Sequence, residues 1–381
     1  MRQYIYIILL ALTAACRTEE EIVPSTNTQV TEADPNVGEL KGLFLLNEGN
    51  MGSNKATIDY FDYASGNYSK NIYAERNPTV VKELGDVGND IQIYEDRLYA
   101  VINCSNLVEV MDVATAAHIG SVTIPNCRNI VFSGPYAYVS SYAGAVELSS
   151  YSQLGYVAKI DLSTLEIIGE CGVGYQPEQM AIVDSKLYVA NSGGYMYPDY
   201  DTTLSVIDLE TFVESHKIEV AINLVGVVAD DRGYLWVSSR GDYYDTPSAT
   251  YVVDSSSDEV VDMLDVANSS MALSGDYLYI CGADFSYTAT DTSTSFTIID
   301  TQSRTIIDTA FIKDNTQDDI TLPYCVAVNP ESGEIFITDA KDYVTPGRLH
   351  CYSANGELQW SATTGDIPAH IVFTTTALES I

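Results

Sequence analysis

The sequence LYVAN at residues 187–191, followed by LSVIDL at residues 204–209, decides the fold of this chain. Both stretches alternate apolar and small or polar side chains, as half-buried β-strands do. The second stretch reaches Asp208, whose carboxylate can accept a hydrogen bond from its own backbone and therefore favours a turn. The pair predicts two strands of an antiparallel sheet with a loop between them.

Six further versions of this unit occur along the chain. An aromatic or equivalent large residue stands at the centre of each first strand, and successive aromatics lie 39 to 57 residues apart. Recurrence of one unit at this spacing indicates a repeat architecture. The central aromatics are Phe44, Tyr99, Tyr138, Tyr188, Trp236, Tyr279 and Phe336. The turn residues are Asp62, Asp112, Asp161, Asp208, Asp254 and Asp300, with Ser353 in the seventh place.

A short apolar strand precedes each aromatic strand, and a hairpin partner follows each turn residue, so each unit has the four antiparallel strands of a propeller blade. The first unit lacks its innermost strand, and the sequence AHIVF at 369–373 supplies one at the C-terminus. Ring closure of this kind removes exposed sheet edges. We therefore predict an all-β, seven-bladed β-propeller of four-stranded antiparallel blades over residues 40–381, closed by a C-terminal strand that completes blade one.

The N-terminus has the features of a targeting segment. Arg2 precedes an apolar run at 4–11 that is too short to span a bilayer as a mature helix. Small residues then lead to Cys16, which resembles a bacterial lipobox. We predict a lipoprotein signal peptide at 1–15, with Cys16 as the lipidated residue and a disordered acidic tether at 16–39. An ordinary secretory signal cleaved nearby is the alternative.

The chain is strongly acidic. It has 18 Lys and Arg residues against 53 Asp and Glu residues, for a formal net charge of −35. This charge argues against nucleic acid or an anionic membrane face as a partner. A solvated acidic surface explains the charge, and electrostatic capture of a cationic ligand is the alternative.

The loops between the second and third strands of each unit are long and rich in tyrosine, whereas the hairpins at the opposite end are short. Exposed aromatics in long loops on a rigid scaffold are typical of binding surfaces, although tyrosines can also pack among themselves. The segments that lead into each blade add polar groups to the same face, including Gln176 and Glu178. Two arginines on this face can bind a ligand carbonyl or phosphate, or can pair with neighbouring carboxylates. The predicted ligand-binding residues are Asn47, Glu48, Asn89, Arg128, Tyr142, Gln179, Tyr195, Tyr197, Arg240, Tyr243, Tyr244, Phe285, Tyr287, Tyr324, Tyr343 and His370.

Motifs for catalysis or metal binding are not apparent in the sequence. The four histidines fall on three different strand types, and the acidic stretches at 199–201 and 314–319 do not have EF-hand spacing. We therefore predict no metal site, no catalytic cofactor and no enzymatic activity. Export permits disulfides, and Cys104 with Cys127 is the first-ranked pair.

The LYVAN…LSVIDL unit resembles the YVTN-type repeat of YncE-like β-propellers. The stretch LLNEGN at 45–50 and the acidic lipoprotein start, RTEEE at 17–21, resemble the BtuG-type surface lipoproteins of gut Bacteroidetes. This resemblance implies a lipoprotein on the outside of the outer membrane. It also implies capture of cobalamin or a related corrinoid and its transfer to a TonB-dependent outer-membrane transporter of the BtuB type. A glycan-binding or scaffolding lipoprotein is the second hypothesis, and a propeller enzyme such as a lactonase or lyase is the third.

Overall fold

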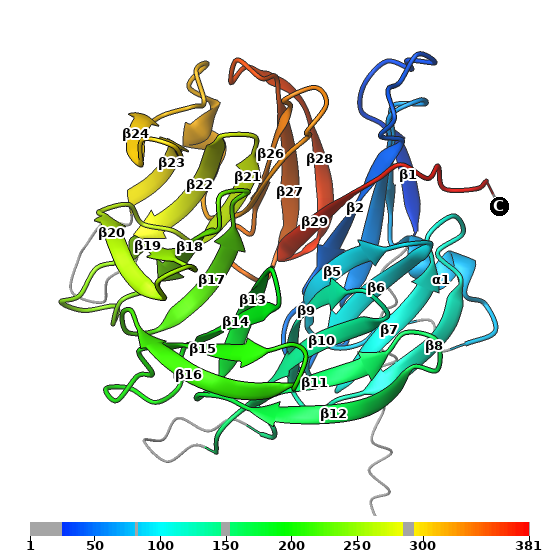
Figure 1. Ribbon diagram of the computed structural model, residues 1–381. Coiled ribbons are helices and arrows are strands. Elements are labelled where there is room, and N and C mark those ends of the chain that lie inside the picture. The colour runs from blue at the N-terminus through cyan, green and yellow to red at the C-terminus, as the bar shows by residue number, and fades with distance from the viewer. Residues whose placement is uncertain (1–24, 81–82, 146–152, 285–292, 381) are drawn as a thin grey trace, which may run out of the picture.

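The computed structural model describes residues 25–80, 83–145, 153–284 and 293–380 (Figure 1). These residues form seven antiparallel sheets arranged as blades in a ring. The predicted seven-bladed propeller is confirmed. Each blade follows chain order from its innermost to its outermost strand, except blade one, which takes strands from both ends of the chain.

Blades two to seven have four strands each, named here from the innermost outward. Blade two has β5 (Gly88–Tyr94), β6 (Arg97–Ile102), β7 (Leu107–Asp112) and β8 (His118–Thr123), and blade three has β9 (Cys127–Ser133), β10 (Tyr136–Ser141), β11 (Tyr156–Asp161) and β12 (Glu166–Gly172). Blade four has β13 (Pro177–Val183), β14 (Lys186–Asn191), β15 (Thr203–Asp208) and β16 (Val213–Glu219), and blade five has β17 (Leu224–Ala229), β18 (Tyr234–Ser239), β19 (Ala249–Asp254) and β20 (Glu259–Leu264). Blade six has β21 (Ser270–Ser274), β22 (Tyr277–Asp284), β23 (Ser293–Asp300) and β24 (Thr305–Asp308), and blade seven has β25 (Pro323–Val328), β26 (Ile335–Asp339), β27 (Pro346–Tyr352) and β28 (Leu358–Asp366).

Blade one closes the ring. The C-terminal strand β29 (Pro368–Thr374) pairs antiparallel with β2 (Gly42–Asn47) and is the innermost strand of the blade, as predicted. Figure 1 shows this red strand beside the blue β2. The strands β3 (Thr57–Asp62) and β4 (Asn67–Lys70) follow outward. Closure thus gives β2, whose side chains are all buried, a partner on each side.

Blade one also has a fifth strand that the sequence pattern does not reveal. The segment Thr26–Gln29 forms β1 and pairs antiparallel with β4 at the outer edge of the blade. The prediction of a disordered tether over 16–39 is therefore wrong for these residues. All four β1 residues are exposed, so the strand is held by main-chain pairing rather than by apolar burial, and composition did not reveal it.

The repeated residues have structural roles. Six of the seven central aromatics are buried, and Tyr279 is half-buried. The hydrophobic core consists of seven clusters, each lying between two adjacent blades. The six repeated aspartates are turn formers, as predicted, because an Oδ1 atom of each accepts a backbone N–H two or three residues later at 2.6 to 2.9 Å.

Helices are short in the described part of the chain. The α-helix α1 (Ile72–Arg76) lies against β3, and the 3-10 helix η1 (Thr316–Asp319) precedes β25. No helix among the described residues has the length and apolar character needed to cross a membrane. The six cysteines from Cys104 to Cys351 are all free thiols, so the expected bridge between Cys104 and Cys127 is wrong. The Cys127 thiol instead lies near the carbonyl oxygens of Ile102 and Leu107.

Strand direction gives the propeller two different ends. The loops between second and third strands emerge at the same end as the segments that lead into the next blade, and we call this end the loop face. The opposite end, which we call the turn face, has the short turns that hold the repeated aspartates.

Candidate ligand-binding site on the loop face

A shared backbone turn places the first residue after the second strand at the centre of the loop face. In five blades the residue two positions beyond the strand has a left-handed φ, which bends the chain sharply. These turn residues are Gly49 (72°), Ala143 (69°), Gly193 (54°), Gly241 (66°) and Lys341 (51°). The residues that precede them are Glu48, Tyr142, Ser192, Arg240 and Ala340. Three of these side chains, Glu48, Tyr142 and Arg240, interact with one another or with shared partners around the mouth of the central channel.

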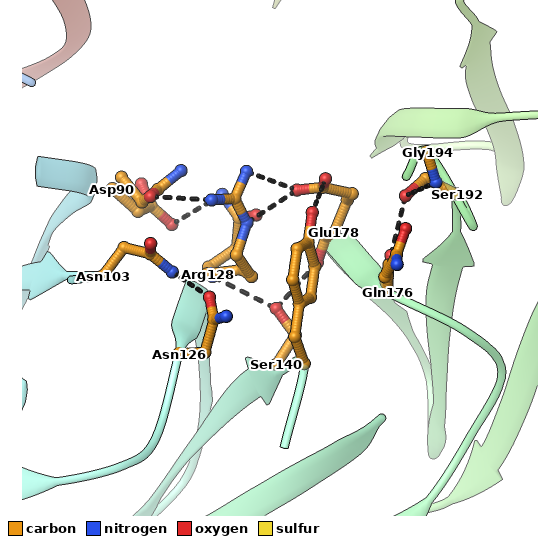
Figure 2. Close-up of polar contacts among 12 residues, drawn as sticks. Asp90, Asn103, Asn126, Arg128, Ser140, Gln176, Glu178, Ser192 and Gly194 are labelled. Atoms are coloured by element: carbon orange, nitrogen blue, oxygen red, sulfur yellow. Dashed lines mark hydrogen bonds and ion pairs between the residues drawn. The ribbon is translucent and has the colours of Figure 1, made fainter. Parts of the chain in front are cut away.

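A buried ion pair joins blades three and four at this mouth (Figure 2). Arg128 Nε and Nη2 lie 3.1 and 3.0 Å from Glu178 Oε2. Arg128 Nη1 donates to Asn89 Oδ1 at 2.9 Å, which extends the network to blade two. The Tyr142 hydroxyl donates to Glu178 Oε1, and the guanidinium carbon of Arg128 lies 4.8 Å from the centroid of the Tyr142 ring. This pair is satisfied within the protein, so we assign it the role of holding the mouth in shape.

A second carboxyl group lies on the other side of the mouth. The Tyr324 hydroxyl donates to Glu48 Oε1 at 3.0 Å, which links blade seven to blade one. Burial raises the pKa of Glu48 to about 7, although the Tyr324 hydrogen bond and the nearby arginines oppose the shift. Glu48 is therefore half protonated near neutral pH and is the group in this mouth whose charge responds to small pH changes.

Arg240 differs from Arg128. Its side chain is exposed, and its guanidinium makes no hydrogen bond or ion pair with any other residue in the described ranges. Burial by the surrounding loops would lower the pKa of Arg240, but Tyr243 and the carboxylate of Glu178 raise it above its usual value. The guanidinium is thus charged and available to a ligand.

Tyrosines from blades four, five and seven form a rim around this mouth. Tyr195 and Tyr343 are 42% and 46% exposed, and the backbone N–H of Tyr195 donates to Gln176 Oε1 at 2.7 Å. Further out, the rings of Tyr197 and Tyr244 lie 5.3 Å apart. The rim therefore combines both expectations for these loops, because its tyrosines contact one another and still present ring surface to solvent.

A cavity of about 340 Å³ lies along the innermost strands β21, β25 and β29 of blades six, seven and one. Gln179 and His370 line this cavity together with Ser270, Met271 and Cys325. Burial lowers the pKa of His370, so its imidazole is neutral at neutral pH. Polar groups thus lie near the loop-face end of the channel, and apolar side chains such as Phe373 line the rest.

Most of the predicted binding residues that the structure describes gather at this mouth or its rim. Asn47 does not, because it is fully buried and its Nδ2 donates to Thr57 Oγ1 at 3.0 Å. It corresponds to Asn191 of blade four, which donates to Thr203 in the same way. Both asparagines therefore connect the end of a second strand to the start of the third. Phe285 and Tyr287 lie outside the described residues.

Two important residues, Gln176 and Glu178, were absent from the predicted set. Both lie in the segment that leads into blade four, and both are buried. The sequence places the Glu178 carboxylate on the same face as Arg128. The spacing of the two residues along the chain does not indicate that they form an ion pair. Among the described residues, no group of three or more His, Cys, Asp or Glu side chains is arranged to hold a metal ion.

Solved structures with a similar fold show the propeller architecture and nothing more, because their sequences are distant. Kuenenia stuttgartiensis hydrazine synthase matches with a TM-score of 0.58 and 17% identity, over 74% of this chain and 88% of that chain. The Neurospora crassa Pan2 WD40 domain matches with a TM-score of 0.52 and 10% identity, over 72% of this chain and 78% of that chain. The computationally designed Ika8 protein matches with a TM-score of 0.50 and 9% identity, over 75% of this chain and 90% of that chain.

No curated protein matches the chain with significance. A family model does match, over residues 41–374, which span all seven blades and the closing strand. The chain therefore belongs to the family described as Domain of unknown function (DUF5074).

Proposed function

We propose that this protein is a cell-surface lipoprotein that captures a corrinoid such as cobalamin on the loop face and passes it to a TonB-dependent outer-membrane transporter. The observation that carries the proposal is the convergence of an unpaired arginine and exposed tyrosine rings on one channel mouth. A corrinoid has apolar ring edges, amide arms and a phosphodiester. The tyrosine rim suits the ring edges, and the arginine suits the amide carbonyls or the phosphodiester.

The resemblance to BtuG-type lipoproteins supports the finer part of the proposal. The stretch LLNEGN at 45–50 includes Glu48, which lies at the mouth, and the acidic stretch RTEEE at 17–21 follows Cys16 in the sequence. In this proposal Cys16 holds the protein at the outer membrane through its lipid, and the transporter is of the BtuB type. The corrinoid is bound as cargo, and we propose neither a catalytic cofactor nor an enzymatic reaction.

Isothermal titration of the protein lacking residues 1–16 with cyanocobalamin tests the proposal. We expect saturable binding, and we expect Tyr195→Ala to weaken it roughly tenfold, because loss of an aromatic contact at a binding centre costs about 1–2 kcal/mol. Tyr277→Ala is the matched control, since Tyr277 is also 42% exposed but lies on the turn face. It should leave the affinity unchanged.

Two results would contradict the proposal that the loop face binds a corrinoid. One is the absence of a saturable signal with cyanocobalamin, and the other is equal weakening by Tyr195→Ala and Tyr277→Ala. Binding on a glycan array in a protein that does not bind corrinoid would instead support the glycan-binding hypothesis, for which the paired rings of Tyr197 and Tyr244 are the candidate platform.

A further inference from the structure

Arg240 has no ion-pair partner among the described residues of a chain in which basic residues are few. The protein has 18 basic residues against 53 acidic ones, and neighbouring carboxylates could have neutralised this guanidinium as Glu178 neutralises Arg128. Among the residues that the structure describes, none approaches the Arg240 guanidinium within ion-pair distance. Its position at the mouth is fixed, because its backbone N–H donates to the carbonyl of Asn223 at 3.1 Å and Gly241 bends the chain directly after it.

Two loops of the same construction, the one that contains Arg240 and its counterpart in blade seven, each carry a tyrosine. Tyr243 in blade five and Tyr343 in blade seven each lie four residues beyond the end of a second strand. Both have a left-handed φ, 66° and 64°, so the two loops turn in the same way at these tyrosines. The preceding aspartates hold these turns: Asp242 Oδ1 accepts three backbone N–H groups at 2.8 to 2.9 Å, and Asp342 Oδ1 accepts two at 2.8 to 3.0 Å.

Both tyrosines are electrostatic neighbours of the arginine. Burial raises the pKa of Tyr343, and the Arg240 guanidinium acts against that shift, which places the Tyr343 phenol within range of its charge. Tyr243 is likewise among the groups that raise the pKa of Arg240. A phenol hydroxyl and a guanidinium are both hydrogen-bond donors, and a guanidinium can bind two oxygens of one phosphate at once.

We propose that Arg240, flanked by Tyr243 and Tyr343, is an oxyanion site that binds the phosphodiester group of the ligand. The inference rests on the same loop face as the proposed function and names the part of the ligand that this side of the mouth recognises. Its chemistry does not depend on a corrin ring, so it can be tested with a simple phosphodiester.

The protonation state of Glu48 makes anion binding at this site depend on pH. The charged and titratable groups that face Glu48 are Tyr324 and Tyr343 from blade seven, Arg240 from blade five, Glu178 from blade four and Arg128 from blade three. Below about pH 7 the Glu48 carboxyl is protonated. Protonation removes one negative charge from the neighbourhood of Arg240, which favours binding of an anion. Above that pH Glu48 becomes charged, and phosphodiester binding should weaken.

The test uses diphenyl phosphate, which stays a monoanion from pH 6 to pH 8, and follows its 31P line width during titration with the protein lacking residues 1–16. We expect saturable broadening, and we expect the neutral analogue diphenylmethanol not to compete. Arg240→Gln should weaken binding at least about tenfold, because charge-assisted hydrogen bonds are lost. Arg240→Lys, which keeps the charge without the bidentate geometry, should weaken it less. Arg304→Gln should have no effect, because Arg304 lies on the turn face, where its guanidinium covers the ring of Tyr234.

Wild-type binding should weaken several-fold from pH 6 to pH 8, and Glu48→Gln should remove this dependence. No broadening with wild type, or equal affinity for wild type and Arg240→Gln, would overturn the oxyanion site. A corrinoid titration run in parallel separates the two proposals: cyanocobalamin binding that is indifferent to Arg240→Gln refutes the oxyanion site alone. Binding of diphenyl phosphate without binding of cyanocobalamin would refute the proposal that the ligand is a corrinoid, and the oxyanion site would stand.

Discussion

Glu178→Ala is expected to lower the free energy of unfolding by about 3 kcal/mol, because it leaves the Arg128 guanidinium without its counter-ion in a largely buried site. The Arg128 side chain is 19% exposed and that of Glu178 is 7% exposed, so water can replace the lost carboxylate only in part. The same change removes the acceptor of the Tyr142 hydroxyl. Urea unfolding should show a lower midpoint with an unchanged slope.

An exposed ion pair provides the control. Lys313 Nζ lies 2.6 Å from Asp308 Oδ2, but the Lys313 side chain is 49% exposed. Asp308→Ala should therefore cost less than about 1 kcal/mol. Removing both partners in the Arg128→Ala, Glu178→Ala double variant should recover part of the loss, because no charge then remains buried alone. Equal, small effects of Glu178→Ala and Asp308→Ala would show that the Arg128–Glu178 pair does not hold the mouth together.

Truncation after Ile367 is expected to prevent formation of the native protein. It removes β29, which pairs with β2 over its whole length, and it exposes the apolar edge of a strand whose residues are all buried. An open propeller has an unpaired innermost edge in blade one and loses packing against both neighbouring blades. We expect loss of the near-UV circular dichroism spectrum and aggregation during size-exclusion chromatography.

Removal of residues 1–29 is the matched control, because it deletes β1 from the outer edge of the same blade. All four residues of β1 are exposed, so this variant should elute like the wild-type protein and keep its near-UV spectrum. If the variant without β29 also eluted like the wild-type protein and kept its near-UV spectrum, then the C-terminal strand would not be the closure on which the ring depends.

The repeat made the fold predictable from the sequence. Each blade contains a corresponding aromatic strand, and six of the seven have an aspartate at the turn, so the evidence for one blade, such as Tyr188 with Asp208, was strengthened by the others. The C-terminal strand could be assigned because blade one lacked an inner strand. β1 could not be predicted, because its residues TNTQ are all exposed and the strand is held by main-chain pairing with β4.

For the candidate site, the sequence predicted that it lies on the loop face but not which side chains point into the mouth. Asn47 and Glu48 are adjacent in sequence, yet Asn47 is buried against Thr57 and Glu48 turns into the mouth, because Gly49 bends the chain between strand and loop. A sequence pattern assigns both residues to the same loop and cannot tell which one points inward. The pairing of Arg128 with Glu178 likewise depends on the ring, which brings together residues 50 positions apart.

The crystal structure of the protein with bound cyanocobalamin is the most direct test of the loop-face site. The proposed function predicts a corrinoid over the mouth of the central channel, in contact with the rim at Tyr195 and with its phosphodiester at Arg240. A corrinoid bound at the turn face or at the outer edge of a blade, with the Arg240 guanidinium still facing solvent, would contradict it.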